Sequence, residues 1–75
     1  MNTFAERLKE LRIEKGIPQR KFAPLIGYGQ QTVSTWECGQ NEPTASAIIA
    51  CAKFFDVTTD YLLGLENDDG SKTRD

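Results

Sequence analysis

Apolar residues recur three or four positions apart along much of the chain, which is the spacing of one face of a helix. Near the start, the pattern predicts a helix from about residue 3 to residue 15, with Gly16 closing it. Near the end, it predicts a helix that begins at Thr44 and a short last helix from residue 58 or 59 to residue 63. The inward-facing residues expected on the two longer helices are Phe4, Leu8, Leu11, Ile48, Cys51, Ala52 and Phe55.

The segment between these helices, residues 16–39, predicts two short helices joined by a tight turn. The first of them ends at Gly27, because glycine adopts the positive φ that lets the chain reverse. Pro18 stands where a capping side chain is usual, so this helix is expected to start without one. Pro24 removes a backbone hydrogen bond, so we expect the helix to be short or bent. Its inward face is made of Phe22, Ala23 and Ile26.

The second of these short helices begins near Gly29 or Gln30 and stops before Gly39. Val33 and Trp36 lie three positions apart and point inward, and we expect Trp36 to be a buried packing residue. The outward face is therefore polar, uncharged and rich in amides. The polar residues of this segment are Gln30, Gln31, Thr32, Ser34 and Thr35.

The amide and hydroxyl side chains of these five residues suit contact with DNA in the major groove, which makes them candidate DNA-contacting residues. A glutamine amide both donates and accepts, so it can bond N6 and N7 of one adenine. Hydroxyls can bond phosphates or base edges, and a threonine methyl can touch thymine. A plain solvated face is the alternative, but the N-terminal residues of the second helix are the ones that reach bases in a helix-turn-helix unit. The sequence therefore predicts such a unit, reading double-stranded DNA.

Landmark residues recur in a fixed order and spacing over residues 8–63: Leu8, Leu11, Arg12, Gly16, Gln19, Phe22, Ala23, Ile26, Gly27, Val33, Trp36, Glu37, Gly39, Pro43, Ala52, Phe55, Val57, Leu62 and Leu63. Through these landmarks the segment resembles the Cro and phage-repressor type of helix-turn-helix regulators. The resemblance implies an all-α, compact five-helix repressor-type domain with the helix-turn-helix formed by helices 2 and 3. It implies that Gln19 contacts a phosphate, that Gln30, Gln31 and Thr35 lie against base edges, and that Arg12 pairs with Glu37.

The pair of Arg12 and Glu37 also has its own physical basis. Arg12 lies four residues after Leu8 and therefore beside the apolar stripe of the first helix. A charge in that position needs a partner, and Glu37 is the nearest plausible acid beyond the first helix. A guanidinium can hold a carboxylate through two bonds. We therefore expect this ion pair to pin the first helix to the third, with no direct role in DNA contact.

The net charge is −2, although a DNA-binding surface is expected to be basic. Residues 64–75 carry two cations and four acids, which accounts for the whole net charge and leaves the rest of the chain neutral. No acid occurs between Lys15 and Trp36, so the cations of that stretch, Lys15, Arg20 and Lys21, lie beside the proposed contact surface. Arg20 and Lys21 are the candidate phosphate contacts.

Three more polar residues are candidates for contact with the DNA backbone. Tyr28 precedes the second motif helix, where its hydroxyl reaches a phosphate or its ring is partly buried. Gln40 and Asn41 follow that helix and either touch the sugar-phosphate backbone or form a plain solvated turn.

Composition excludes several classes of protein. The chain of 75 residues has no histidine, no nucleophile pair and no phosphate-binding loop, so we expect no enzyme, no cofactor and no metal. Its apolar runs are too short to span a membrane and its start is amphipathic, which indicates a cytoplasmic protein. Cys51 reads as a small core residue, and a disulfide with Cys38 is not expected in a reducing compartment.

The expected organisation is one DNA-binding domain in residues 1–65 and an acidic, disordered tail in residues 66–75. We expect a non-enzymatic repressor that binds a palindromic operator as a homodimer. An antitoxin that binds DNA and a protein toxin, or a protein-interaction module on the same scaffold, are the alternatives. The candidate dimer surface is made of Phe54, Tyr61 and Leu65.

Overall fold

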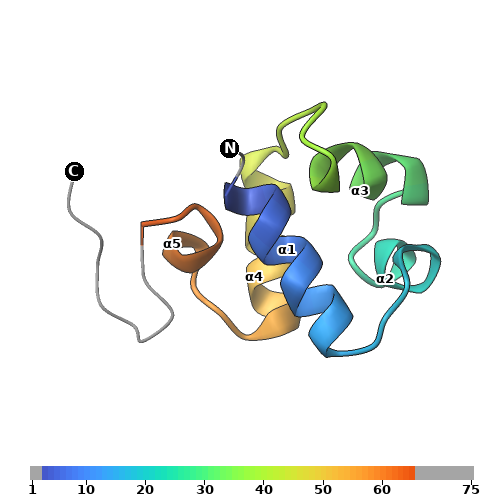
Figure 1. The fold of residues 1–75 in the computed structure, drawn as a ribbon, viewed down its shortest axis with the longest axis horizontal. Coiled ribbons are helices and arrows are strands. Elements are labelled where there is room, and N and C mark those ends of the chain that lie inside the picture. Colours follow the sequence, from blue (N-terminus) through green and yellow to red (C-terminus); the bar gives the residue numbers. More distant parts are fainter. Residues whose placement is uncertain (1–2, 66–75) are drawn as a thin grey trace.

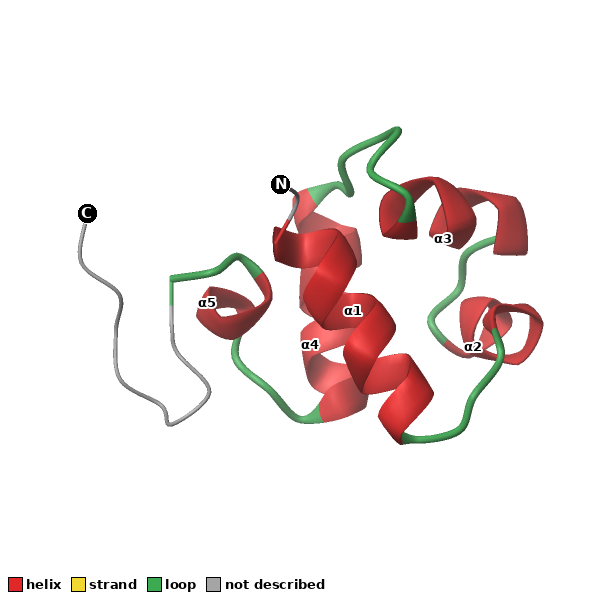
Figure 2. Ribbon diagram, viewed as in Figure 1, coloured by secondary structure: helices red, strands yellow, loops and turns green. Residues whose placement is uncertain are grey.

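The structure is a computed structural model that describes residues 3–65 (Figure 1). The disordered tail expected at residues 66–75 therefore lies outside the described residues. Every regular element in the described range is a helix, as Figure 2 shows. The helices are α1 (Thr3–Glu14), α2 (Gln19–Leu25), α3 (Gln30–Glu37), α4 (Ala45–Phe55) and α5 (Thr59–Leu62). The prediction of an all-α fold with five helices is confirmed.

The helices pack around one core. Helix α1 lies across α4 in Figure 1 and contacts both α3 and α5, while α2 packs on α3. The buried side chains of this core are Phe4, Leu8, Phe22, Ala23, Val33, Trp36, Ala47, Cys51, Ala52, Phe55 and Leu62. On α4, Cys51, Ala52 and Phe55 are buried as expected, and Ile48 is half-buried and packs against the core. Ala47 is also fully buried, although the sequence pattern did not place it in the core.

An aromatic cluster joins α2 to α4. The ring of Phe22 stacks on Phe55 at a centroid distance of 5.3 Å and meets Phe54 edge-on, also at 5.3 Å. Such aromatic pairs contribute about 0.5–1.5 kcal/mol each beyond the area that they bury. Phe22 is fully buried, so these ring contacts anchor α2 against α4.

The proline effects expected for α2 are present. Pro18 occupies the N-cap in an extended conformation and provides no side-chain hydrogen bond. Pro24 lies inside a helix of only seven residues, which confirms the prediction of a short helix. Gly27 then takes a φ of 83°, and the chain turns into α3.

The later helices start with side-chain caps. The hydroxyl of Thr44 accepts a hydrogen bond from the backbone N–H of Ala47, and that of Thr58 accepts one from Tyr61. Asp56 caps the end of α4 and adopts the left-handed conformation that glycine usually takes after a helix. Among residues 3–65, no helix has both the length and the apolar character needed to cross a bilayer.

Candidate nucleic-acid interface

Helix α3 has one buried face and one open face. Val33 is fully buried and Trp36 is 3% exposed, so both anchor the helix in the core. Gln30, Gln31 and Thr32 are exposed at its first turn, opposite the core. Because the N-terminal turn of a recognition helix is the part that reaches bases, this open polar face is the candidate DNA-reading surface.

The two remaining hydroxyl residues of α3, Ser34 and Thr35, are less available for contact with DNA than the sequence predicts. Ser34 and Thr35 are half-buried. The Thr35 hydroxyl donates to the backbone carbonyl of Thr32 at 2.6 Å, so its donor is used within the helix. Thr35 can still accept a hydrogen bond or offer its methyl group to a base.

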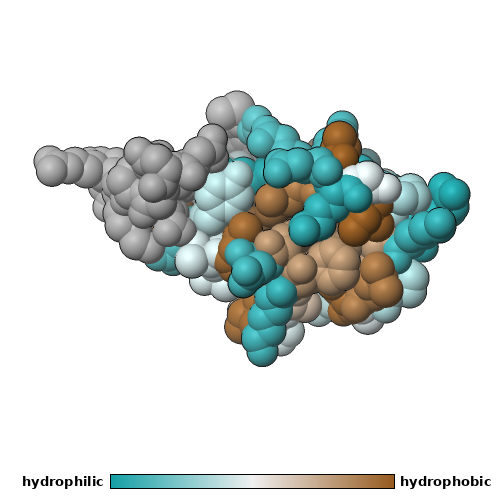
Figure 3. Space-filling model, turned by 90° about the horizontal axis from the view of Figure 1, so that it is seen from below, coloured by the Kyte–Doolittle hydropathy of each residue, from teal (hydrophilic) through white to brown (hydrophobic). Residues whose placement is uncertain are grey.

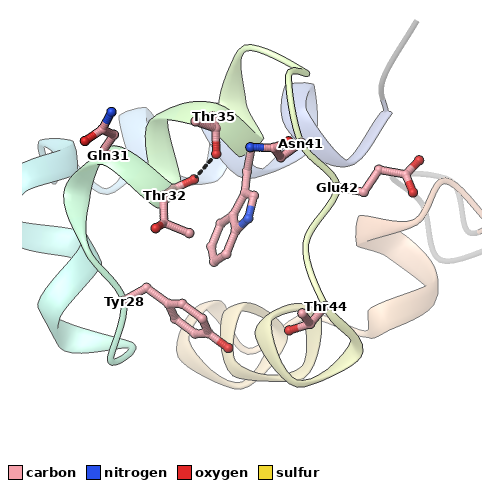
Figure 4. A pocket seen from close by; sticks show the side chains of 8 residues that line it. Tyr28, Gln31, Thr32, Thr35, Asn41, Glu42 and Thr44 are labelled. Atoms are coloured by element: carbon pink, nitrogen blue, oxygen red, sulfur yellow. Dashed lines mark hydrogen bonds between the residues drawn. The ribbon is translucent and has the colours of Figure 1, made fainter.

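A hollow of about 380 Å³ lies beside α3 (Figure 4). The rings of Trp36 and Tyr28 meet edge-on there at 5.0 Å between centroids, so the Tyr28 ring is partly buried. In Figure 4 the Tyr28 hydroxyl is directed toward the start of α4. The residues that line the hollow are Tyr28, Gln31, Thr32, Thr35, Trp36, Asn41, Glu42 and Thr44.

The loop after α3 folds back onto the end of that helix. The backbone N–H groups of Gln40 and Asn41 both donate to the Thr35 carbonyl, at 3.0 and 3.3 Å. Their side chains are exposed and remain available for contact with a ligand. The loop is thus held beside the hollow by main-chain bonds.

Charge is distributed unevenly around α3. Lys15, Arg20 and Lys21 are all exposed, and the last two lie in the first turn of α2, the helix that packs on α3. The exposed Glu42 lies at the opposite side, in the loop that borders the hollow. The favourable side for a phosphate backbone is therefore the side of α2.

An ion pair fixes the far end of α3. Arg12 Nε donates to Glu37 Oε2 at 2.7 Å, and Arg12 Nη2 donates to Glu37 Oε1 at 2.8 Å. Hydrogen bonding to Glu37 raises the pKa of the Arg12 guanidinium, and the opposite charge adds to this effect against the cost of burial. The expected bond between α1 and α3 is therefore present, in the bidentate geometry.

Gln19 lies at this ion pair in the structure. Its Nε2 donates to Glu37 Oε1 at 3.1 Å, and the side chain is half-buried at the start of α2. The family resemblance implies a phosphate contact for Gln19, which is a different role from the one that this bond indicates. Residue spacing gave no sign of its bond to Glu37, because that bond depends on how α2 and α3 are packed.

The two cysteines have different surroundings, and both are free thiols. Cys51 is fully buried, which confirms the prediction of a core residue, and burial raises its pKa to about 12. Cys38 is exposed at the end of α3. Within residues 3–65, no group of three or more acidic, cysteine or histidine side chains could hold a metal ion.

Two of the three residues suggested for a dimer surface are engaged within the chain. Phe54 is half-buried in the aromatic cluster, and Tyr61 lies under the Arg7 guanidinium, 4.4 Å from ring centroid to Cζ. Leu65 is 47% exposed. Figure 3 shows apolar side chains reaching the surface on the face seen from below. Over the described residues, the exposed large apolar side chains are Ile13, Leu25, Ile49, Leu63 and Leu65.

Five helices around one core, with a tight turn between α2 and α3 and an open polar face on α3, define a helix-turn-helix domain. Residues 8–62 match the Helix-turn-helix family, and the chain belongs to this family.

Relatives and solved structures agree with that assignment. The chain is 35% identical over 63 residues to the HTH-type transcriptional activator BcrR of Enterococcus faecalis, which covers 84% of this chain and 31% of BcrR. It is 35% identical over 60 residues to the SPbeta prophage-derived HTH-type transcriptional regulator YonR of Bacillus subtilis, covering 80% of this chain and 56% of YonR. The chain thus spans less than two thirds of either relative.

The fold is also similar to that of the P22 c2 repressor, solved in complex with a synthetic operator. The TM-score is 0.78 at 27% identity, and the match covers 84% of this chain and 96% of the repressor chain.

Proposed function

We propose that this protein is a sequence-specific regulator of transcription that binds double-stranded DNA and reads the major groove with α3. One observation carries the proposal: Gln30 and Gln31 are exposed at the first turn of a helix whose opposite face is buried. An amide pair on a rigid, outward-facing helix matches the donor and acceptor pattern of adenine.

The comparisons support regulation rather than catalysis. Of the two relatives named above, one is a transcriptional activator and the other a transcriptional regulator, and the solved structure is a repressor in complex with an operator. We propose a repressor that acts in the cytoplasm. A DNA-binding domain of this kind represses when its site overlaps that of the transcription machinery, because both cannot occupy one duplex.

Contacts divide into two groups. Gln30 and Gln31 contact base edges, and Thr32, Ser34 and Thr35 contact bases or nearby phosphates. Arg20 and Lys21 contact phosphates on the α2 side, where the charge is favourable. On the other side the exposed neutral residues Gln40 and Asn41 contact the sugar-phosphate backbone.

We propose that the protein binds as a symmetric homodimer on a palindromic operator. Two copies of α3 then enter successive major grooves about 34 Å apart. The proposed contact surface of each subunit carries few cations, so one subunit alone binds DNA weakly. A dimer doubles the phosphate contacts and so raises the affinity.

The test is selection of bound duplexes from a random pool, followed by fluorescence anisotropy with the selected duplex and a scrambled one. We expect an inverted repeat and a preference of at least about 10³-fold for the selected duplex at physiological salt. A protein-interaction module on this scaffold would enrich no sequence and would bind neither duplex at low salt. Light scattering of the complex would report two chains for each selected duplex.

A further inference from the structure

The carboxylate of Glu37 collects hydrogen bonds from two other helices. Arg12 of α1 provides two of them, at 2.7 and 2.8 Å, and Gln19 of α2 provides a third through Nε2 at 3.1 Å. Glu37 is the last residue of α3, and its side chain is only 4% exposed. Helices α1, α2 and α3 thus meet at one buried carboxylate.

Each partner fixes a different part of this junction. Arg12 also donates to the backbone carbonyl of Ile17 at 2.9 Å, which ties down the linker before α2. Gln19 is the first residue of α2, so its bond joins the start of α2 to the end of α3. Removing the Gln19 amide would therefore free α3 from α2 at this point while the bidentate ion pair remained.

The direction of the Gln19 amide follows from its partner. A carboxylate only accepts hydrogen bonds, so the amide atom that faces Glu37 is the nitrogen. One of the two N–H donors of that nitrogen is thereby used within the protein. A phosphate only accepts hydrogen bonds, so it could bind the second N–H but not the amide oxygen, and the affinities of the variants must separate the two roles.

We infer that Gln19 is a positioning residue: it acts through Glu37 to hold α3 at a fixed angle against α2, and so sets the register of Gln30 and Gln31 on the bases. This inference rests on the proposed function. It differs from the phosphate contact that the family resemblance implies for the same residue. A shift of a rigid helix at one end moves the side chains at its other end, so the effect appears at the bases.

The two roles give different patterns of affinity. A phosphate contact weakens binding about uniformly across sequences, whereas loss of register weakens only the selected duplex. The test uses Gln19→Met, which keeps the length of the side chain without its hydrogen bond, and Gln19→Ala. Each is measured by anisotropy on the selected and the scrambled duplex, after circular dichroism has shown the native helix content.

We expect both variants to lose about tenfold on the selected duplex, the size of one hydrogen bond to a charged group, and to stay within about twofold on the scrambled duplex. Lys21→Ala serves as the reference for a phosphate contact and weakens both duplexes. Glu37→Gln combined with Gln19→Met should lose less selectivity than the two single losses together, since both act at one bond.

Equal losses on both duplexes would overturn the inference and assign Gln19 to a phosphate. Unchanged affinity on both would overturn it as well. If Glu37→Gln does not fold, the ratio of the two affinities for Gln19→Met decides alone. A wild-type protein with no preference for any duplex would refute the proposed function, and this inference with it. A wild-type preference that Gln19→Met leaves unchanged refutes only the role of Gln19.

Discussion

Arg12 and Glu37 lie 25 positions apart in the sequence and meet through two parallel hydrogen bonds, from Nε to Oε2 and from Nη2 to Oε1. Their side chains are only 11% and 4% exposed. Solvent screens this pair far less than an ion pair on the surface, where the contribution is usually below about 1 kcal/mol. We therefore expect the largest effect on the free energy of unfolding when one member of the pair is removed.

Replacing Glu37 with glutamine should lower the free energy of unfolding by about 3–5 kcal/mol, because the Arg12 charge is left buried without its counter-charge. Urea unfolding followed by circular dichroism measures this loss. The matched control is Glu10→Gln on the exposed face of α1, which should change stability by no more than about 0.5 kcal/mol. Similar small effects for both variants would mean that the buried pair does not hold α1 to α3.

Gln31→Ala should weaken binding to the selected duplex by about 1–3 kcal/mol and relax the base preference at one position of each half-site. The reason is that the exposed amide is removed without a change in the buried face of α3. Repeating the selection with the variant protein measures the preference. Weakening that is the same for every sequence would reassign Gln31 to the DNA backbone.

Lys21→Ala should weaken binding to all duplexes and reduce the slope of log K against log salt concentration by about 1 for each subunit. Lys21 is exposed in the first turn of α2, the helix that packs on α3. Anisotropy titrations over a range of salt concentrations give the slope. Lys9→Ala, an exposed lysine on α1, is the control and should leave the slope unchanged. An unchanged slope for Lys21→Ala as well would place the DNA on another face.

Cys51 should resist alkylation until the protein unfolds, whereas Cys38 should react in the native state. Burial raises the pKa of Cys51 to about 12 from its ordinary value of 9.0, so the reactive thiolate is scarce at mildly alkaline pH. Labelling of a Cys38→Ser variant isolates Cys51, and its rate should rise with urea. Rapid labelling of that variant without denaturant would show that the core is open.

The raised pKa of Cys51 also makes the stability of the fold depend on pH. Since the pKa of Cys51 is higher in the folded protein than in the unfolded chain, its ionisation favours the unfolded chain. Its contribution to the free energy of unfolding is complete below pH 9.0 and is lost as the pH rises toward about 12. A Cys51→Ala variant should show a shallower decline over that range, and an equally steep decline would assign the effect to other groups.

Much of the fold could be predicted from local patterns. The spacing of Val33 and Trp36 placed α3, and the threonine at position 44 marked the start of α4. The pairing of Arg12 with Glu37 could also be predicted, because a cation beside an apolar stripe requires a counter-charge and few acids were in reach.

Features that depend on the packing of whole helices could not be predicted. Ala47 of α4 is fully buried whereas Ile48 is only half-buried. The space left by neighbouring side chains determines which of the two positions packs fully into the core. The left-handed Asp56 departs from the usual glycine, so local sequence did not announce it. The bond of Gln19 to Glu37 requires the relative placement of two helix ends, which no spacing along the chain contains.

The role of α3 is tested at the level of single atoms by replacing purines of the selected duplex, one at a time, with their 7-deaza forms. This change removes the N7 acceptor from the major groove and leaves the minor groove intact. We expect one position in each half-site to lose affinity with wild-type protein and to lose none with Gln31→Ala, because the contact is already absent. Binding that is indifferent to every 7-deaza substitution, or losses that are the same with and without the Gln31 amide, would contradict major-groove reading by this helix.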